Sequence, residues 1–253
     1  MMQTAVGGEA SAKEARAYEE EEEEEEGRGD GDAGGGSGGR SDRVGGRSNE
    51  SPLTELGEEQ ARKLGEWLRD EDKTCFDAMF ASTAVRAKET ARIALQTVGE
   101  AHPEVPIRLD SRLVEMSQGE WTGKLRRECY TAQAMDAIWE DPRNFKAPGG
   151  ESKQELETRI LEALHEMTDP TLGCRTVAIF GHGIAFKCFL RWLNDGSWAS
   201  SHSVQLDNTG IIRVDRVATH NQPDAWKLGS VNMQNHLASA NSRSRRSPKK
   251  LRT

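Results

Sequence analysis

The chain has 253 residues, of which 42 are acidic and 34 basic, and its formal net charge is −8 at pH 7. No apolar run approaches the ~20 residues that a membrane span needs, and the N-terminus has no apolar signal core, so we expect neither a membrane segment nor secretion. The four cysteines stand far apart without a Cys-x-x-Cys pair, which argues against a zinc site and against a disulfide framework. These features favour a cytoplasmic protein with reduced thiols.

Composition divides the chain into three parts. Residues 1–42 contain an unbroken run of glutamates, Glu19 to Glu26, followed by a stretch dominated by glycine. Such a segment cannot bury enough apolar surface to offset its chain entropy, so we expect a disordered acidic and glycine-rich tail. Residues 238–253 carry six basic and no acidic side chains and form a second, basic disordered tail. The segment between them, residues 43–237, is long enough for one ordinary domain.

The middle part alternates strand-like and helix-like patterns, and the helices have recognisable starts. Thr54 and Thr83 precede two of them and are the expected N-caps. Alternating strands and helices predict a three-layer α/β/α domain with a mostly parallel sheet. In chain order the predicted elements are a helix over 54–68, a strand over 76–82, a helix over 83–98, a weaker strand over 105–109, helices over 125–140 and 152–167, a strand over 175–180, a helix over 184–193, and strands over 209–217 and 225–231.

Two polar residues stand where a strand gives way to a helix. Arg86 lies in the first turn after the strand over 76–82, and His182 lies in the turn after the strand over 175–180. Functional groups of parallel sheets gather at these carboxyl ends, and helix N-termini attract anions such as phosphate. An arginine fork fits phosphate oxygens, and histidine can bind or transfer phosphate. Taken singly, neither residue is specific: an arginine in a first helical turn is more often a plain surface residue, and a histidine after a strand is more often a packed structural residue.

A third segment, "RLVEMSQGEWTGK" over 112–124, places Glu115 just after a strand-like stretch. With "SPLTELGEEQARKLGEWL", "FASTAVRAKETA" and "AIFGHGIAFK" it resembles the histidine phosphatase superfamily, the phosphoglycerate-mutase-like phosphatases, in the family's order and at roughly its spacings. "PGGESKQELETRI" and "LDNTGI" are also similar to segments of that family. The resemblance covers about 51–232.

This resemblance implies a two-step phosphoryl transfer without metal or cofactor. In the family, the histidine of an N-terminal Arg-His-Gly tripeptide attacks phosphorus, two arginines and a second histidine hold the phosphoryl oxygens, and a carboxylic acid protonates the leaving oxygen. Carried over by position, Arg86 is the second arginine, His182 the second histidine with Gly183 beside it, and Glu115 the proton donor. The implied partner is a phosphorylated small molecule or a phosphoprotein, and no membrane.

The Arg-His-Gly segment itself is missing from this sequence. Its expected place falls near residues 32–34, which read Asp-Ala-Gly, and the first histidine of the chain is His102. The nucleophile, the first arginine and the first central strand of the sheet are therefore all expected to be absent, because a glycine-rich tail cannot supply an apolar strand. Two explanations stay open: a mistaken gene model or alternative start, which we favour, and a degenerate relative.

Function is accordingly predicted at two levels. The first prediction is a histidine phosphatase that hydrolyses phosphoric monoesters and is impaired or inactive as written. The alternative is a non-catalytic phospho-ligand-binding or interaction module.

The tail sequence "RSRRSPKK" resembles a nuclear import signal and is equally readable as a solvated basic tail; binding to nucleic acid is not expected. Arg126, Arg127 and Arg143 either contact an acidic substrate or are plain surface residues. The oligomeric state is not predicted.

Overall fold

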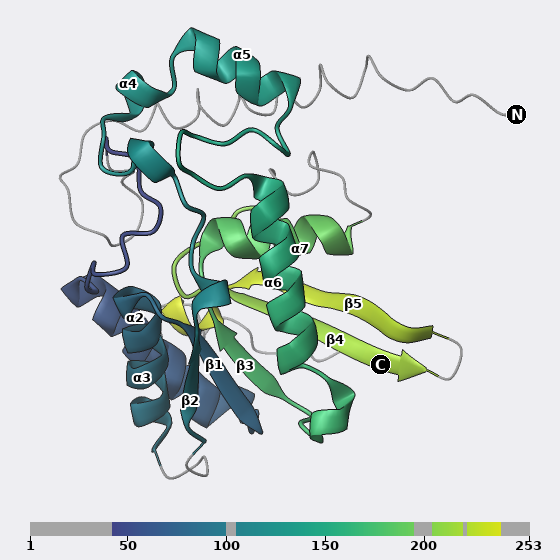
Figure 1. The fold of residues 1–253 in the computed structure, drawn as a ribbon. Coiled ribbons are helices and arrows are strands. Elements are labelled where there is room, and N and C mark those ends of the chain that lie inside the picture. Colours follow the sequence, from purple (N-terminus) through teal and green to yellow (C-terminus); the bar gives the residue numbers. More distant parts are fainter. Residues whose placement is uncertain (1–41, 100–104, 195–203, 220–221, 239–253) are drawn as a thin grey trace, which may run out of the picture.

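The computed structural model describes residues 42–99, 105–194, 204–219 and 222–238 (Figure 1). The two predicted tails lie almost entirely outside these ranges, so their boundaries stay predictions. No helix within the described ranges is long and apolar enough to cross a membrane. The four cysteines are all free of disulfide bonds.

A parallel sheet of three strands lies at the centre of the described chain, in the order β2-β1-β3. A separate antiparallel pair, β4 and β5, lies beyond β3 in Figure 1. The predicted α/β class with a parallel sheet is confirmed. The strands are β1 (Ala78–Ser82), β2 (Ile107–Asp110), β3 (Val177–Phe180), β4 (Ile211–Thr219) and β5 (Gln222–Met233).

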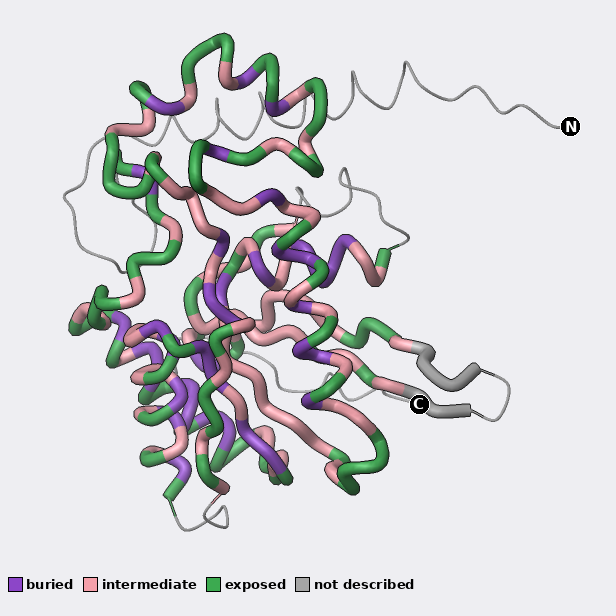
Figure 2. Tube along the Cα trace, viewed as in Figure 1, coloured by how far each residue is buried: buried purple, intermediate pink, exposed green. Residues whose placement is uncertain are grey.

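Helices cover both faces of the parallel sheet, which gives the three predicted layers (Figure 1). Successive side chains of a strand point to opposite faces. Phe180 accordingly packs on the core of the α2 and α3 side, while its neighbour Ile179 packs on the core of the α6 and α7 side. Buried residues follow these helices in Figure 2. The four helices are α2 (Glu55–Trp67), α3 (Val85–Val98), α6 (Lys153–Met167) and α7 (Gly183–Leu193).

Local side-chain caps start half of the six described α-helices. Thr54 caps α2 as predicted, with its hydroxyl oxygen accepting from the Gly57 N–H at 3.1 Å. Ser152 and Glu155 form a reciprocal capping box at the start of α6. The prediction for Thr83 is wrong, because the N-cap of α3 is Ala84 and no side chain caps that helix.

The single helix predicted over 125–140 is also wrong. The structure has two helices there, α4 (Arg126–Cys129) and α5 (Ala132–Glu140). The Thr131 hydroxyl accepts from the Ala134 N–H at 3.3 Å and caps α5. A cap of this kind starts a new helix, so the helix breaks here although the apolar periodicity of the sequence continues across the junction.

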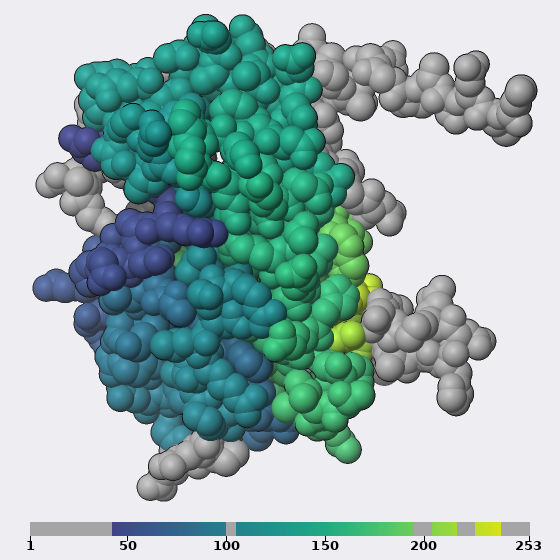
Figure 3. All heavy atoms as spheres, in the orientation of Figure 1, coloured from purple at the N-terminus to yellow at the C-terminus, as the bar shows by residue number. Residues whose placement is uncertain are grey.

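Residues 117–150, which we call the insert, carry α4 and α5 and stand above the carboxyl edge of the sheet in Figure 1. The first described residues lie against the insert (Figure 3). The Val44 N–H donates to the Lys124 carbonyl and the Val44 carbonyl accepts from the Gly123 N–H, both at 2.8 Å. The chain therefore runs past the insert before it enters α2.

Strand β3 is less buried than its neighbour β1. All four residues of β3 are half-buried, whereas four of the five residues of β1 are buried. Strand β3 pairs with β1 on one edge, and its other edge has no strand partner among the described residues. The expected first central strand is thus absent from the described part of the chain.

Candidate active site

The three predicted site residues meet at the carboxyl edge of the parallel sheet. Arg86 lies in the first turn of α3, directly after β1, and His182 is the N-cap of α7, directly after β3. Glu115 follows β2 through the short 3-10 turn Ser111–Leu113. The charge of Arg86 acts on both Glu115 and His182. The convergence is a property of the fold, whereas the catalytic and phosphate-binding roles of these residues stay predictions.

His182 is buried and uncharged. Its side chain is 8% exposed, and its Nε2 lies 2.9 Å from the Ser82 hydroxyl oxygen. Burial, together with the nearby cations Arg86 and Arg159, lowers the pKa of His182 to about 3. The imidazole is therefore neutral at physiological pH and acts through one donor and one acceptor nitrogen.

The glycines on either side of His182 differ in their surroundings. A Cβ placed on Gly181 would stand 2.7 Å from the ring of Phe186, so a larger residue there would force the ring to shift. A Cβ on Gly183 would meet no atom within 4 Å. Gly183 thus opens on free space at the N-terminus of α7, and its N–H has no hydrogen-bond acceptor among the described residues. A ligand anion has room to approach this end of the helix.

Glu115 caps α7 from a different segment of the chain. The His182 side chain does not cap the helix. Instead the Glu115 carboxylate accepts from the N–H groups of Ile184 and Ala185, each at 3.2 Å, and from the Met116 N–H at 2.8 Å. Burial raises the pKa of the Glu115 carboxyl, although these donors and the charge of Arg86 oppose the rise. A raised pKa is the direction that a proton donor needs.

Arg86 keeps most of its hydrogen-bonding capacity. Its side chain is half-buried, and its Nη1 donates to the Ser48 carbonyl at 2.8 Å. Burial lowers the pKa of Arg86 and the neighbouring Glu115 carboxylate raises it; the guanidinium stays charged at neutral pH. Because Ser48 takes its one hydrogen bond to the described residues, the other N–H groups of the fork are open to phosphoryl oxygens.

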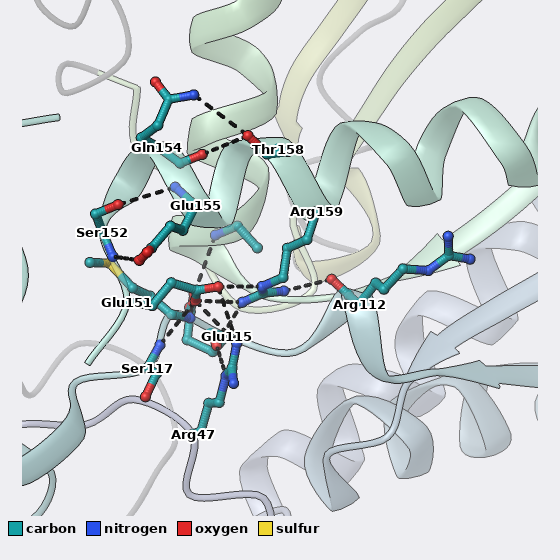
Figure 4. A network of polar contacts seen from close by, with 12 residues as sticks. Arg47, Arg112, Glu115, Ser117, Glu151, Ser152, Gln154, Glu155, Thr158 and Arg159 are labelled. Atoms are coloured by element: carbon teal, nitrogen blue, oxygen red, sulfur yellow. Dashed lines mark hydrogen bonds and ion pairs between the residues drawn. The ribbon is translucent and has the colours of Figure 1, made fainter. Parts of the chain in front are cut away.

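A polar cluster of Arg47, Ser117, Glu151 and Arg159, here called the Glu151 cluster, fixes the backbone beneath Glu115 (Figure 4). The Glu151 carboxylate accepts from Arg159 at 2.7 and 2.9 Å, from Arg47 at 3.2 Å and from the Ser117 N–H at 3.3 Å. Both arginines also donate to the Glu115 carbonyl at 3.1 Å. Arg47 and Arg159 therefore fix the main chain at Glu115, and the Glu151 carboxylate fixes the position of both arginines.

Sequence reasoning missed Ser82 and the members of the Glu151 cluster. A signal existed for some of them. Ser82 is a polar residue at the end of an apolar strand, and Glu151 and Arg159 lie eight positions apart in "PGGESKQELETRI". Arg143, one of the arginines with two predicted alternatives, pairs with Glu157 at 3.2 Å.

The sequence profile described as "Histidine phosphatase superfamily (branch 1)" matches residues 35–229. The chain belongs to the histidine phosphatase superfamily. The matched range contains Arg86, Glu115, His182 and Gly183, and its first histidine is His102, which lies outside the described residues. The predicted family is thereby confirmed.

Relatives and solved structures agree with this assignment. "Probable phosphoglycerate mutase GpmB" of Salmonella paratyphi C is 30% identical over 201 residues, which cover 77% of this chain and 87% of the relative. Bacillus stearothermophilus YhfR superposes with a TM-score of 0.65 at 28% identity, covering 78% of this chain and 91% of that one. Mycobacterial glucosyl-3-phosphoglycerate phosphatase, 22% identical with 75% and 91% coverage, shares the fold at a TM-score of 0.61.

Proposed function

We propose that the edge formed by Arg86, Glu115 and His182 binds the phosphoryl group of a phosphomonoester. The observation that carries the proposal is the meeting of three different groups at the start of α7. They are an open arginine fork, a neutral buried histidine and a carboxyl whose pKa is raised. The unused Gly183 N–H and the positive end of the helix add attraction for an anion.

The same arrangement supports a route for the proton. A phosphoryl dianion bound beside Glu115 adds a like charge, which raises the pKa of this carboxyl further. Glu115 would then hold a proton and give it to the leaving oxygen as the phosphorus–oxygen bond breaks. Arg86 and the helix N-terminus would stabilise the charge on the equatorial oxygens.

The remaining part of the reaction is the nucleophile. By family resemblance, hydrolysis passes through a phosphohistidine on the histidine of Arg-His-Gly, and this chain has no histidine before His102. We therefore propose a metal-independent histidine phosphatase that is impaired or inactive as written. Loss of a nucleophile costs on the order of a million-fold in a dissected protease.

The substrate class we propose is a phosphorylated small molecule. Superposable structures include glucosyl-3-phosphoglycerate phosphatase and an Entamoeba histolytica phosphoserine phosphatase variant bound to phosphoserine. Both names describe esters of small hydroxyl compounds, and this supports the same class here. A phosphoprotein substrate stays the alternative.

A second candidate function is a non-catalytic phospho-ligand-binding module. It is favoured by one observation: the groups suited to hold an anion are present, whereas the nucleophilic segment is not. Binding and turnover separate the two functions, because only the enzyme needs the missing histidine.

Two measurements on the whole chain test these proposals. We expect inorganic phosphate to bind, and Arg86→Ala to weaken that binding, whereas Arg92→Ala on the exposed side of α3 should leave it unchanged. We expect hydrolysis of p-nitrophenyl phosphate to be negligible. Turnover at ordinary rates that His182→Ala abolishes would contradict the impaired state. Absence of both binding and turnover would contradict the site.

A further inference from the structure

We infer that Ser82 is a positioning residue that holds the His182 ring with its proton on Nδ1. Its consequence for phosphate binding rests on the function proposed above. The position of the proton is a property of the ligand-free protein and is testable without any activity.

The fold places Ser82 against His182 across two neighbouring strands. Ser82 is the last residue of β1, and β1 pairs with β3 in a register that sets Ala81 opposite Phe180. The residue after Ala81 is therefore brought next to the turn that follows Phe180. The Ser82 hydroxyl oxygen lies 2.9 Å from Nε2 of His182, and Ser82 is 0% exposed.

Counting hydrogen bonds fixes the direction of this contact. A serine hydroxyl has one hydrogen to donate and can accept two hydrogen bonds. The Ser82 oxygen already accepts from the Ala84 N–H at 3.2 Å. Its own hydrogen is shielded from water, and among the described residues the acceptor within reach is Nε2 of His182. A buried hydroxyl left without an acceptor is unfavourable, so the hydroxyl donates to Nε2.

The direction of that bond decides what His182 offers to a ligand. A neutral imidazole carries one proton, so a ring that accepts at Nε2 is protonated at Nδ1. The neutral state is the stable one here, since burial and two nearby cations disfavour the imidazolium. An Nδ1–H group donates to a phosphoryl oxygen, whereas the other tautomer would turn a lone pair toward it. Ser82 therefore determines whether the neutral ring attracts or repels phosphate at Nδ1.

The test is the two-bond nitrogen–proton correlation spectrum of the full chain with ¹⁵N-labelled histidine, recorded without ligand at pH 7. His182→Gln identifies the His182 signals among the six histidines of the chain. We expect a protonated Nδ1 and an unprotonated Nε2. Ser82→Ala should shift the proton toward Nε2, and Ser82→Cys, a weaker donor of similar size, should give an intermediate population. Thr83→Ala, at the exposed neighbour, is the control and should change nothing.

Two results overturn the inference. One is a wild-type spectrum with the proton on Nε2, which decides the question even if the Ser82 variants fail to fold. The other is a Ser82→Ala spectrum with the same tautomer population as the wild type.

Titration of the same samples with inorganic phosphate tests the consequence. Loss of a neutral hydrogen bond should weaken binding by about five-fold in Ser82→Ala. Equal affinity in both proteins would overturn the role of Ser82 in binding. If the wild type binds no phosphate, the proposed function fails, while the tautomer still decides the positioning role.

Discussion

His182 and His236 are both buried, 8% and 4% exposed, and burial lowers their pKa values from 6.5 to about 3 and about 4. Between pH 6.5 and these values the unfolded chain binds protons that the folded chain does not. Stability present above pH 6.5 should therefore be lost as the pH falls toward 4, with a slope of up to about 1.4 kcal/mol per pH unit for each histidine. Urea unfolding at a series of pH values measures the slope. His236→Gln should make this slope less steep. An unchanged slope would contradict the lowered pKa of His236.

Glu115 should matter for stability as well as for chemistry, because it caps α7. Replacing a capping side chain by alanine typically costs about 0.5–2 kcal/mol, and Glu115→Ala should fall in this range. Glu115→Gln keeps one acceptor oxygen and should lose less. Thermal unfolding followed by circular dichroism compares the two variants. If the alanine variant is as stable as the wild type, the carboxylate does not cap the helix in solution.

At the scale of elements, the Glu151 cluster ties the loop of the predicted acid to α6. Glu151→Ala would remove the carboxylate partner of two arginines, of which Arg159 is largely buried, with 16% of its side chain exposed, and Arg47 is more exposed, at 38%. We expect a loss of about 2–4 kcal/mol in unfolding free energy. Glu59→Ala is the matched control, since its pair with Arg62 on α2 is solvent-exposed and should contribute less than about 1 kcal/mol. Equal effects of the two substitutions in urea unfolding would show that the Glu151 cluster contributes no more to stability than an exposed ion pair.

The same scale shows where sequence reasoning succeeds. The cap at Thr54 was predictable because its hydrogen bond closes within three residues. The break at Thr131 was missed because apolar periodicity continues across it. Arg86, Glu115 and His182 were predictable because each follows a strand, and parallel strands bring their carboxyl ends together. The contact of Ser82 with His182 was not, since the two residues stand 100 positions apart and only the strand register reveals the contact.

At the scale of the whole molecule, the described strands form two sheets, with one edge of β3 unpaired between them. A strand with covered faces and a free edge has backbone donors and acceptors ready for another strand. The half-buried state of all four β3 residues fits such an incomplete neighbourhood. The unpaired edge of β3 and the missing histidine are independent observations. Both indicate that the same element is missing, the first strand expected from the family.

Restoring that strand therefore tests both the proposed place of the missing strand beside β3 and the proposed phosphatase function. Residues 1–41 would be replaced by a short apolar strand ending in Arg-His-Gly with a family-like linker, which keeps Asp42 and its hydrogen bond to the insert. Each large apolar side chain that becomes buried should contribute roughly 1.5–3 kcal/mol, and each kcal/mol raises Tm by roughly 2–4 °C in a domain of this size. We expect a higher Tm, together with phosphatase activity that a chelator does not inhibit and a base-stable phosphohistidine that labelled substrate traps.

A second chain, identical except that the strand ends in Arg-Asn-Gly, separates structure from chemistry. It should gain the same Tm and no activity, because asparagine can complete the sheet and cannot accept the phosphoryl group as a nucleophile. If neither chain becomes more stable, the unpaired edge of β3 is not where the strand belongs. If both become more stable and the histidine chain stays inert, the groups around Arg86, Glu115 and His182 no longer support transfer, and the non-catalytic binding module becomes the better account.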